Sequence, residues 1–243
     1  MSDDITVDRD GNVGRLVIDL PPMNVLSRSA IEELESSFEQ LDEDRDVKAV
    51  VLSSVGEKAF CAGVAVEDHM GEELPEMIEV FGSLFETFRG AQTPIVAAVD
   101  GRALGGGCEL VAGCDMAVAA EQAVFAQPEI NLGTFPPVAA ALFPDLMGDA
   151  AAFELVMTGD EIGAERARDL GLVNRVVDPD AVESEAEELA SSFAEKSGLV
   201  VGMAKQAFYD VADEDSFESA LEAADDHAID ITGTEDGQEG LQA

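Results

Sequence analysis

Two carboxylates, Glu109 and Glu129, have the sequence surroundings that an acid–base pair would need. Glu109 follows a triple glycine and a cysteine, and Glu129 lies in Gln127-Pro128-Glu129, shortly before Gly133. Both segments are rich in alanine, valine and glycine, where burying a lone carboxylate is unfavourable. A pair of carboxylates kept in such places indicates proton transfer to and from a small substrate.

Each carboxylate also has a simpler explanation. Glu109 lies in the first turn of a predicted helix, where a negative charge complements the helix dipole. Glu129 would be an ordinary solvated loop residue in a chain this acidic. Two neighbouring glycine turns make both simpler explanations less favoured, because such turns can present backbone amides to the same substrate.

The first of these turns is 60–64, where Gly63 allows a tight path and the Val64 amide can point into a cavity. The second is Gly105-Gly106-Gly107, which opens a predicted helix whose first amides lack partners and carry the positive end of its dipole. Two amides aimed at one point form an oxyanion hole for a carbonyl that gains negative charge. The alternative is that these glycines only permit close packing. The phosphate-binding patterns G-x-G-x-x-G and G-x-x-x-x-G-K-[ST] do not occur in the expected places.

Composition predicts one sizeable core with an appendage, which we divide into residues 1–190 and 191–243. The chain has 243 residues, is 47% hydrophobic and carries a net charge of −39, from 52 acidic and 13 basic residues. The apolar content argues against disorder, so the charge must cover a folded surface. An acidic surface with only four lysines is typical of a protein from a high-salt cytoplasm, where salt screens self-repulsion. The absence of a basic stripe argues against nucleic-acid or anionic-membrane partners.

The remaining sequence features point to the cytoplasm and away from metal chemistry. The three cysteines, Cys61, Cys108 and Cys114, lack metal-ligand spacing and are expected to be reduced and buried. The acidic N-terminus does not resemble a signal peptide, and no apolar run approaches the ~20 residues of a membrane span. No metal cluster motif is present, and we expect no cofactor.

Hydrophobic spacing predicts alternating strands and helices followed by helices alone. The expected strands are 14–20, 47–53, 94–99, 116–119, 124–125 and 172–177. The expected helices are 29–42, 76–89, 108–114, 150–158, 165–170, 181–193, 199–211 and 217–231. Segments 60–64 and 101–107 are expected to be turns. The last helix has an apolar stripe that should pack on the core or on a neighbouring subunit: Phe217, Leu221, Ala224, Ala228 and Ile231.

Several motifs in order, from about Arg15 to about Gly240, resemble the enoyl-CoA hydratase/isomerase (crotonase) superfamily. The motifs are Phe60-Cys61-Ala62-Gly63, Ala103-Leu104-Gly105-Gly106-Gly107-Cys108-Glu109-Leu110, Cys114-Asp115, Gln127-Pro128-Glu129-Ile130-Asn131-Leu132-Gly133, Thr158-Gly159-Asp160-Glu161-Ile162, Ala167 and Gly171-Leu172-Val173.

The resemblance implies an α/β crotonase-type spiral of ββα turns with a C-terminal helical region that trimerises, often as a dimer of trimers. It implies an acyl-CoA substrate whose thioester carbonyl is held by the amides of Val64 and Gly106. The two hydratase glutamates correspond to Glu109 and Glu129, and having both favours syn addition of water. In one common account Glu109 takes the proton of the water and Glu129 supplies one to the α carbon, but the assignment stays open because a coupled pair titrates as a unit.

The substrate is expected to contact further residues of the same motifs: Ala62, Gly63, Gly105, Gly133, Phe135 and Pro136. The segment 134–144, together with Val64 and Asp68-His69, is similar to cyclohexa-1,5-diene-1-carbonyl-CoA hydratases. Phe135, the two prolines that follow it and Phe143 would form a rigid apolar wall suited to a ring or a branched acyl group. The alternative is that this wall is only packing.

Two features depart from the family pattern. A lysine that contacts the adenine region of CoA in many members is replaced by Glu67, and the printed sequence lacks the usual basic tail after Gly240. Arg28 is a candidate substitute for binding the CoA phosphates. His69 and Tyr209 are expected to be structural rather than catalytic.

Two other functions remain open from the sequence. The same scaffold could catalyse Δ3-Δ2 enoyl-CoA isomerisation, which can work with one carboxylate. A non-catalytic binding protein could also keep the fold, and Glu67 and the missing basic tail favour that interpretation.

Overall fold

The computed structural model describes residues 4–56, 58–65 and 71–242. Glu67, Asp68 and His69, which the sequence analysis considered, lie outside the described residues. Within the described residues, no helix is long and apolar enough to cross a bilayer.

Two sheets form the body of the molecule. The larger has the order β1-β2-β3-β5-β7-β10, and the smaller has the order β4-β6-β8-β9. The strands of the larger sheet are β1 (Ile5–Asp10), β2 (Val13–Ile18), β3 (Ala49–Ser54), β5 (Ile95–Val99), β7 (Met116–Ala120) and β10 (Arg175–Val177). Those of the smaller are β4 (Ala59–Cys61), β6 (Arg102–Leu104), β8 (Val124–Ala126) and β9 (Ile162–Gly163).

The chain passes from the larger sheet to the smaller one three times, as β3 then β4, β5 then β6, and β7 then β8. Within each sheet these strands pair in parallel. β5 is buried at every position, as expected for a parallel strand covered on both faces. The predicted spiral of ββα turns is confirmed, and its repeated crossings bring the ends of β4 and β6 beside each other.

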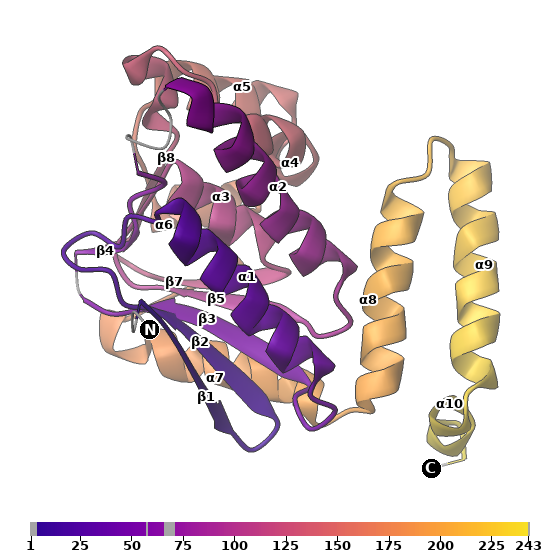
Figure 1. Ribbon diagram of the computed structural model, residues 1–243. Coiled ribbons are helices and arrows are strands. Elements are labelled where there is room, and N and C mark those ends of the chain that lie inside the picture. The colour runs from indigo at the N-terminus through magenta and orange to yellow at the C-terminus, as the bar shows by residue number, and fades with distance from the viewer. Residues whose placement is uncertain (1–3, 57, 66–70, 243) are drawn as a thin grey trace.

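Helices cover both faces of the larger sheet (Figure 1). α1 (Arg28–Glu43) and α2 (Leu74–Gly90) lie on one face, and α7 (Val182–Ala194) lies on the other. α1 has the expected amphipathic pattern, and its buried face includes Ile31, Leu34 and Phe38. The shorter helices of the body are α3 (Gly106–Gly113), α4 (Pro137–Met147), α5 (Asp149–Thr158) and α6 (Ala164–Leu170).

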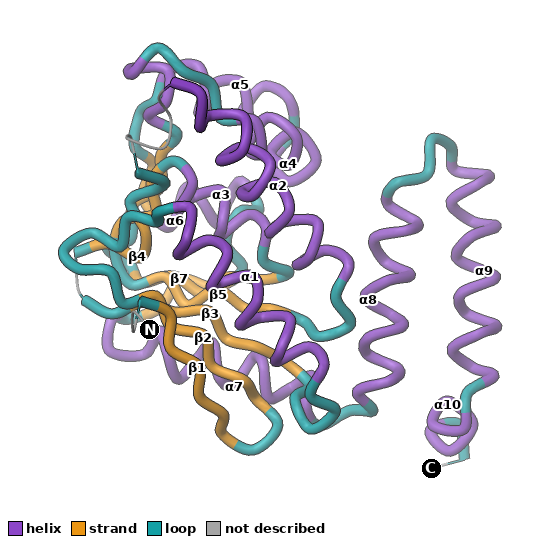
Figure 2. The backbone as a smooth tube through the Cα atoms, in the orientation of Figure 1, coloured by secondary structure: helices purple, strands orange, loops and turns teal. Residues whose placement is uncertain are grey.

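The last three helices stand beside the body, as the tube view also shows (Figure 2). α8 (Gly198–Ala212) lies nearest the body, α9 (Phe217–Gly233) runs along α8, and α10 (Glu235–Gly240) follows α9. We call these three helices the C-terminal arm. α9 has no buried residue, and Phe217 is 84% exposed. Of the two expected places for the α9 stripe, packing on the core is wrong, because α8 separates α9 from the body. Packing on a neighbouring subunit stays a prediction.

One full helix and several short elements account for the main differences from the sequence prediction. The helix α4 has 11 residues and was not expected, because Pro144 lies inside it and proline usually interrupts a helix. The turns expected at 60–64 and 101–107 contain β4 and β6, each three residues long and too short to show an alternating pattern. β1 was missed because five of its six residues are exposed. β9 and α10 were missed as well, since β9 has two residues and α10 has six.

Candidate active site

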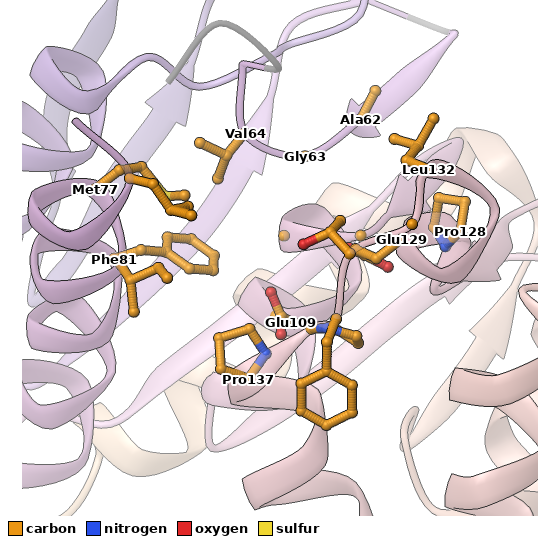
Figure 3. Close-up of a pocket in the computed structure, with 18 residues that line it drawn as sticks. Ala62, Gly63, Val64, Met77, Phe81, Glu109, Pro128, Glu129, Leu132 and Pro137 are labelled. Carbon is orange, nitrogen blue, oxygen red and sulfur yellow. The ribbon is translucent and has the colours of Figure 1, made fainter. Parts of the chain in front are cut away.

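One cavity of about 600 Å³ is lined by all ten residues that the sequence analysis assigned to catalysis, to the oxyanion hole or to direct substrate contact (Figure 3). These are Ala62, Gly63, Val64, Gly105, Gly106, Glu109, Glu129, Gly133, Phe135 and Pro136. They come from the loop after β4, from the start of α3, from the 3-10 turn Pro128–Leu132 and from the loop before α4.

The Val64 amide is directed by a single parallel bridge between Leu26 and Val64. The amide of Leu26 donates to the carbonyl oxygen of Gly63 at 2.9 Å, and the amide of Ala65 donates to the carbonyl oxygen of Leu26 at 2.8 Å. In this pattern the N–H of Val64 points away from Leu26. Gly63 makes the turn with φ +99°, a conformation that favours glycine.

The Gly106 amide is the first of α3 and therefore has no partner inside its helix. A Cβ built on Gly106 would lie 3.4 Å from the Val64 nitrogen, and a Cβ built on Gly63 would lie 3.4 Å from the Gly106 nitrogen. Neither amide donates to a backbone acceptor in the described part of the chain. The two N–H groups thus lie close together at the cavity wall.

The three glycines of this turn meet three different constraints. Gly105 has φ +53°, and a side chain there would collide with Oε1 of Glu129. A side chain at Gly107 would collide with the backbone of Cys61 in β4, so packing alone explains this glycine. Gly106 instead faces Val64 and lines the cavity.

The side chain of Glu109 is buried, with 3% of the residue exposed, and its carboxylate lies at the start of α4. The backbone amide of Ala139, in the first turn of α4, donates to its Oε1 at 2.7 Å. The residue before α4, Pro136, offers no capping side chain, so Glu109 supplies the acceptor and the negative charge that this helix start favours. Glu109 was expected to complement its own helix, and the structure shows that it also complements α4.

The pKa of Glu109 is raised to about 7, chiefly by burial and in smaller part by the nearby charge of Glu129. The amides of Ala139 and Val138 act in the opposite direction, because they stabilise the ionised form. In the described residues no lysine or arginine forms an ion pair with Glu109. Glu109 can therefore hold or release a proton near neutral pH.

Glu129 is half-buried and is held by a residue that the sequence analysis quoted but did not assign to the site. Gln127 is fully buried, and its amide nitrogen donates to both carboxylate oxygens of Glu129, at 3.2 and 3.0 Å, in the orientation that satisfies its hydrogen bonds. An amide buried in an apolar segment is the signal that could have identified it.

The opposite wall comes from α2, through Leu74, Met77, Ile78 and Phe81. Figure 3 shows Met77 and Phe81 facing Glu109 and Glu129 across the cavity. Met77 and Phe81 belong to the helix that the sequence analysis expected at 76–89, but helical spacing does not separate a cavity wall from a core. Pro137, which the sequence analysis placed in the apolar wall, also lines the cavity. Further wall residues that it did not select are Pro128, Leu132 and Thr134.

The expected apolar wall over 134–144 forms only in part. Phe135 and Pro136 line the cavity, but Phe143 is fully buried in the core and does not. The reason is that 137–147 is the helix α4, which turns Phe143 away. Expecting Phe143 in the wall was therefore wrong.

Two other candidate residues lie outside the cavity lining. Arg28 forms an ion pair with Glu76 of α2 at 2.7 Å, on the surface. Tyr209 donates to Asp115 at 2.7 Å and lies under the guanidinium of Arg89, in keeping with a structural role. Within the described residues, no group of three or more His, Cys, Asp or Glu side chains could hold a metal ion.

Comparison with known proteins agrees with this arrangement. Residues 8–243 match the model of the family described as enoyl-CoA hydratase/isomerase. The chain is 32% identical over 247 residues to a crotonyl-CoA hydratase of Syntrophomonas wolfei, covering 99% of this chain and 94% of the relative. It is 35% identical over 205 residues to a probable mitochondrial enoyl-CoA hydratase of Dictyostelium discoideum, covering 83% of this chain and 74% of the relative.

Among solved structures, the crystal structure of an enoyl-CoA hydratase from Mycobacterium smegmatis superposes with a TM-score of 0.92 at 35% identity. It covers 99% of this chain and 95% of that one. The chain belongs to the enoyl-CoA hydratase/isomerase family.

Proposed function

We propose that the protein is an enoyl-CoA hydratase, a hydro-lyase that adds water across a double bond conjugated to a CoA thioester. The observation that carries the proposal is the cavity in which two backbone amides and two carboxylates meet. Family membership and relatives that are named as hydratases support the same activity.

The amides of Val64 and Gly106 bind the thioester oxygen. When water attacks the β carbon, the π electrons of the double bond move toward the thioester, and its oxygen gains negative charge. Two N–H donors placed in advance stabilise that charge without reorganisation, and one such donor is typically worth ~10²–10³ in rate.

Glu109 and Glu129 hold the attacking water and transfer the protons. The water oxygen bonds to the β carbon, one water proton passes to one carboxylate, and the α carbon receives a proton from the other. Because the pKa of Glu109 is about 7, the pair can share one proton near neutral pH. Both carboxylates face α2 from one side of the cavity, which favours addition to one face of the double bond (Figure 3).

The proposed reaction moves only water and protons, so it needs no cofactor beyond the CoA of the substrate. Crotonyl-CoA is the simplest candidate substrate. A cyclic dienoyl-CoA is the second candidate, because Phe135, Pro136 and Pro137 give the cavity a stiff apolar edge against which a ring can lie. Arg28 remains the candidate for binding the CoA phosphates, in exchange for its ion pair with Glu76.

We also propose a homotrimer or hexamer assembled through the C-terminal arm, and a surface adapted to high salt. The exposed apolar side chains of α8 and α9, including Phe208, Phe217 and Ile229, support the assembly. The net charge of −39 supports the salt adaptation, because such a surface repels itself in dilute buffer.

The test is product identification in molar KCl. The protein is incubated with crotonyl-CoA, with the cyclic dienoyl-CoA and with a β,γ-unsaturated acyl-CoA, and products are identified by mass spectrometry. A β-hydroxyacyl-CoA formed from crotonyl-CoA supports the hydratase. Conversion of the β,γ-unsaturated substrate to its conjugated isomer, with no hydration, would make the protein an isomerase. No product from any substrate and no thermal shift with CoA would indicate the non-catalytic alternative.

A further inference from the structure

The backbone amide of Ala139 belongs to a helix start, yet it serves the active-site cavity. Ala139 is the third residue of α4 and is fully buried. Its amide donates to Oε1 of Glu109 at 2.7 Å. Figure 3 shows Glu109 beside Pro137, the first residue of this helix. A backbone group thus holds one carboxylate oxygen, which restricts rotation of the carboxylate about its last bond.

Other helices of this chain use the corresponding amide for a different purpose. In α1 the third amide, from Ala30, donates at 3.3 Å to the hydroxyl of Ser27, the residue just before the helix. Helices α8, α9 and α10 are capped in the same way by Ser197, Ser216 and Thr234. Such a side chain satisfies an amide that has no partner within the helix. In α4 this amide is left for Glu109.

The residue just before α4 is Pro136, which has no side-chain acceptor. Its φ of −85° and ψ of 101° are extended, as at an ordinary cap position, so a serine could adopt the same backbone conformation. Pro136 is buried and lines the cavity. This helix start therefore differs from the capped ones in the type of residue and not in the class of backbone conformation.

The same amide contact acts on the charge of Glu109. Among the described residues that line the cavity, the other ionisable group is Glu129, and the wall from α2 and from the loop after β4 is apolar. Cys108, the neighbour of Glu109 on α3, has a pKa raised above the ordinary thiol range, chiefly by burial. The amides of Ala139 and Val138 are therefore the groups that stabilise the ionised form of Glu109.

Resting on the proposed hydratase function, we propose that Pro136 and the Ala139 amide are positioning groups for Glu109. The proline leaves α4 without a cap of its own, and the amide that stays open orients the carboxylate. Oε1 is held by the helix, and Oε2 is the oxygen that meets the water or the α carbon of the substrate. A capping side chain at residue 136 would compete for the same amide and release Glu109.

Pro136→Ser introduces the competing acceptor. Pro136→Ala is the matched control, because it removes the same ring and the same cavity contact without offering an acceptor. Both variants are assayed as folded protein with crotonyl-CoA in molar KCl. We expect kcat of Pro136→Ser to lie about tenfold below that of Pro136→Ala, while their KM values agree within about twofold, because a reacting group has lost its orientation.

The pH profile of kcat is a readout that a loss of packing would not move. When serine takes the amide, the ionised form of Glu109 loses a donor, so the pKa of Glu109 rises. The limb of the profile that Glu109 sets should lie about one pH unit higher in Pro136→Ser than in Pro136→Ala. The direction is the same whether Glu109 acts as the acid or as the base.

Thermal unfolding tests the contact without the reaction. In a Glu109→Leu background the Ala139 amide has lost its acceptor, so a serine at residue 136 can cap it freely. Pro136→Ser should then have a Tm about 2–4 °C above that of Pro136→Ala. With Glu109 in place the difference should be smaller, because serine and glutamate compete for one donor.

Two results would overturn the inference. The first is the same kcat and the same pH profile for Pro136→Ser and Pro136→Ala. The second is a Tm difference between these variants that is equal with Glu109 and with Glu109→Leu, since serine and Glu109 would then not compete. If the wild type hydrates no enoyl-CoA, the proposed function itself fails, and the Tm comparison alone decides whether α4 holds Glu109.

Discussion

Glu109 and Asp115 lie near opposite ends of α3, and the protein surrounds these two carboxylates differently. Asp115 accepts hydrogen bonds from the Ile95 amide at 2.7 Å and from the Tyr209 hydroxyl at 2.7 Å, and it forms an ion pair with Lys205 at 2.9 Å. Glu109 accepts from backbone amides and has no cationic partner in the described residues.

The difference separates a structural carboxylate from one that can exchange a proton. Lys205 is itself held by the carbonyl oxygens of Phe88 and Thr93, so the Asp115 cluster fastens α8 to the body. Glu109 is buried without a cation, so its protonated form is accessible near neutral pH.

The largest expected effect on stability is at Asp115. Asp115→Asn leaves Lys205, whose side chain is 5% exposed, without its anionic partner. Removing one member of a buried ion pair typically costs about 3–5 kcal/mol. We expect a loss of that order in the free energy of unfolding, measured with denaturant in molar KCl.

The control is Asp46→Asn, because the side chain of Asp46 is 75% exposed in its pairing with Arg9. It should change stability by less than about 1 kcal/mol. If both substitutions changed the free energy of unfolding equally, the Asp115 cluster would not stabilise the packing of α8 on the body.

The next effect concerns the amides of the cavity. A methyl group at Gly106 would lie 3.1 Å from a side-chain carbon of Val64 and 3.4 Å from its nitrogen, in the space proposed for the thioester oxygen. Gly106→Ala should lower kcat for crotonyl-CoA by ~10²–10³, as for the loss of one oxyanion donor. Gly82→Ala, where a methyl meets nothing within 4 Å, should leave kcat unchanged. Normal turnover by Gly106→Ala would exclude the proposed oxyanion site.

The smallest effect is on the pH dependence of stability. The pKa of Glu109 is raised from 4.5 to about 7, so between these values the folded protein holds this proton more tightly than the unfolded chain does. Stability contributed by this group therefore falls as pH rises through that window and stays lower above it.

Glu109→Gln removes this loss. Relative to wild type, the variant should gain stability between pH 5 and pH 8, by at most about 3 kcal/mol. Unfolding at the two pH values measures the gain, and Glu39→Gln on the exposed side of α1 should show none. A gain that is the same at both pH values would mean that Glu109 titrates normally.

The sequence predicted the site better than it predicted the surrounding elements. Glycines and two glutamates at fixed spacing marked the two turns and the carboxylates Glu109 and Glu129, because main-chain turns and buried charge leave local signals. The oxyanion amides of Val64 and Gly106 were implied by the family resemblance that these motifs carry. The partners of these residues come from distant segments. The amide of Ala139 reaches Glu109 only because α4 begins there, and the contribution of α2 to the opposite wall depends on packing. Gln127 was within the motif, but its link to Glu129 is visible only in three dimensions.

The most direct test of this account is the turnover of crotonyl-CoA by Glu109→Gln, Glu129→Gln and Asp115→Asn, each measured on folded protein in molar KCl. If Glu109 and Glu129 both act on the substrate, each glutamine variant should lose ~10²–10⁴ in kcat, while Asp115→Asn keeps turnover close to that of wild type. A Glu109→Gln or Glu129→Gln variant that hydrates crotonyl-CoA at the wild-type rate would contradict it.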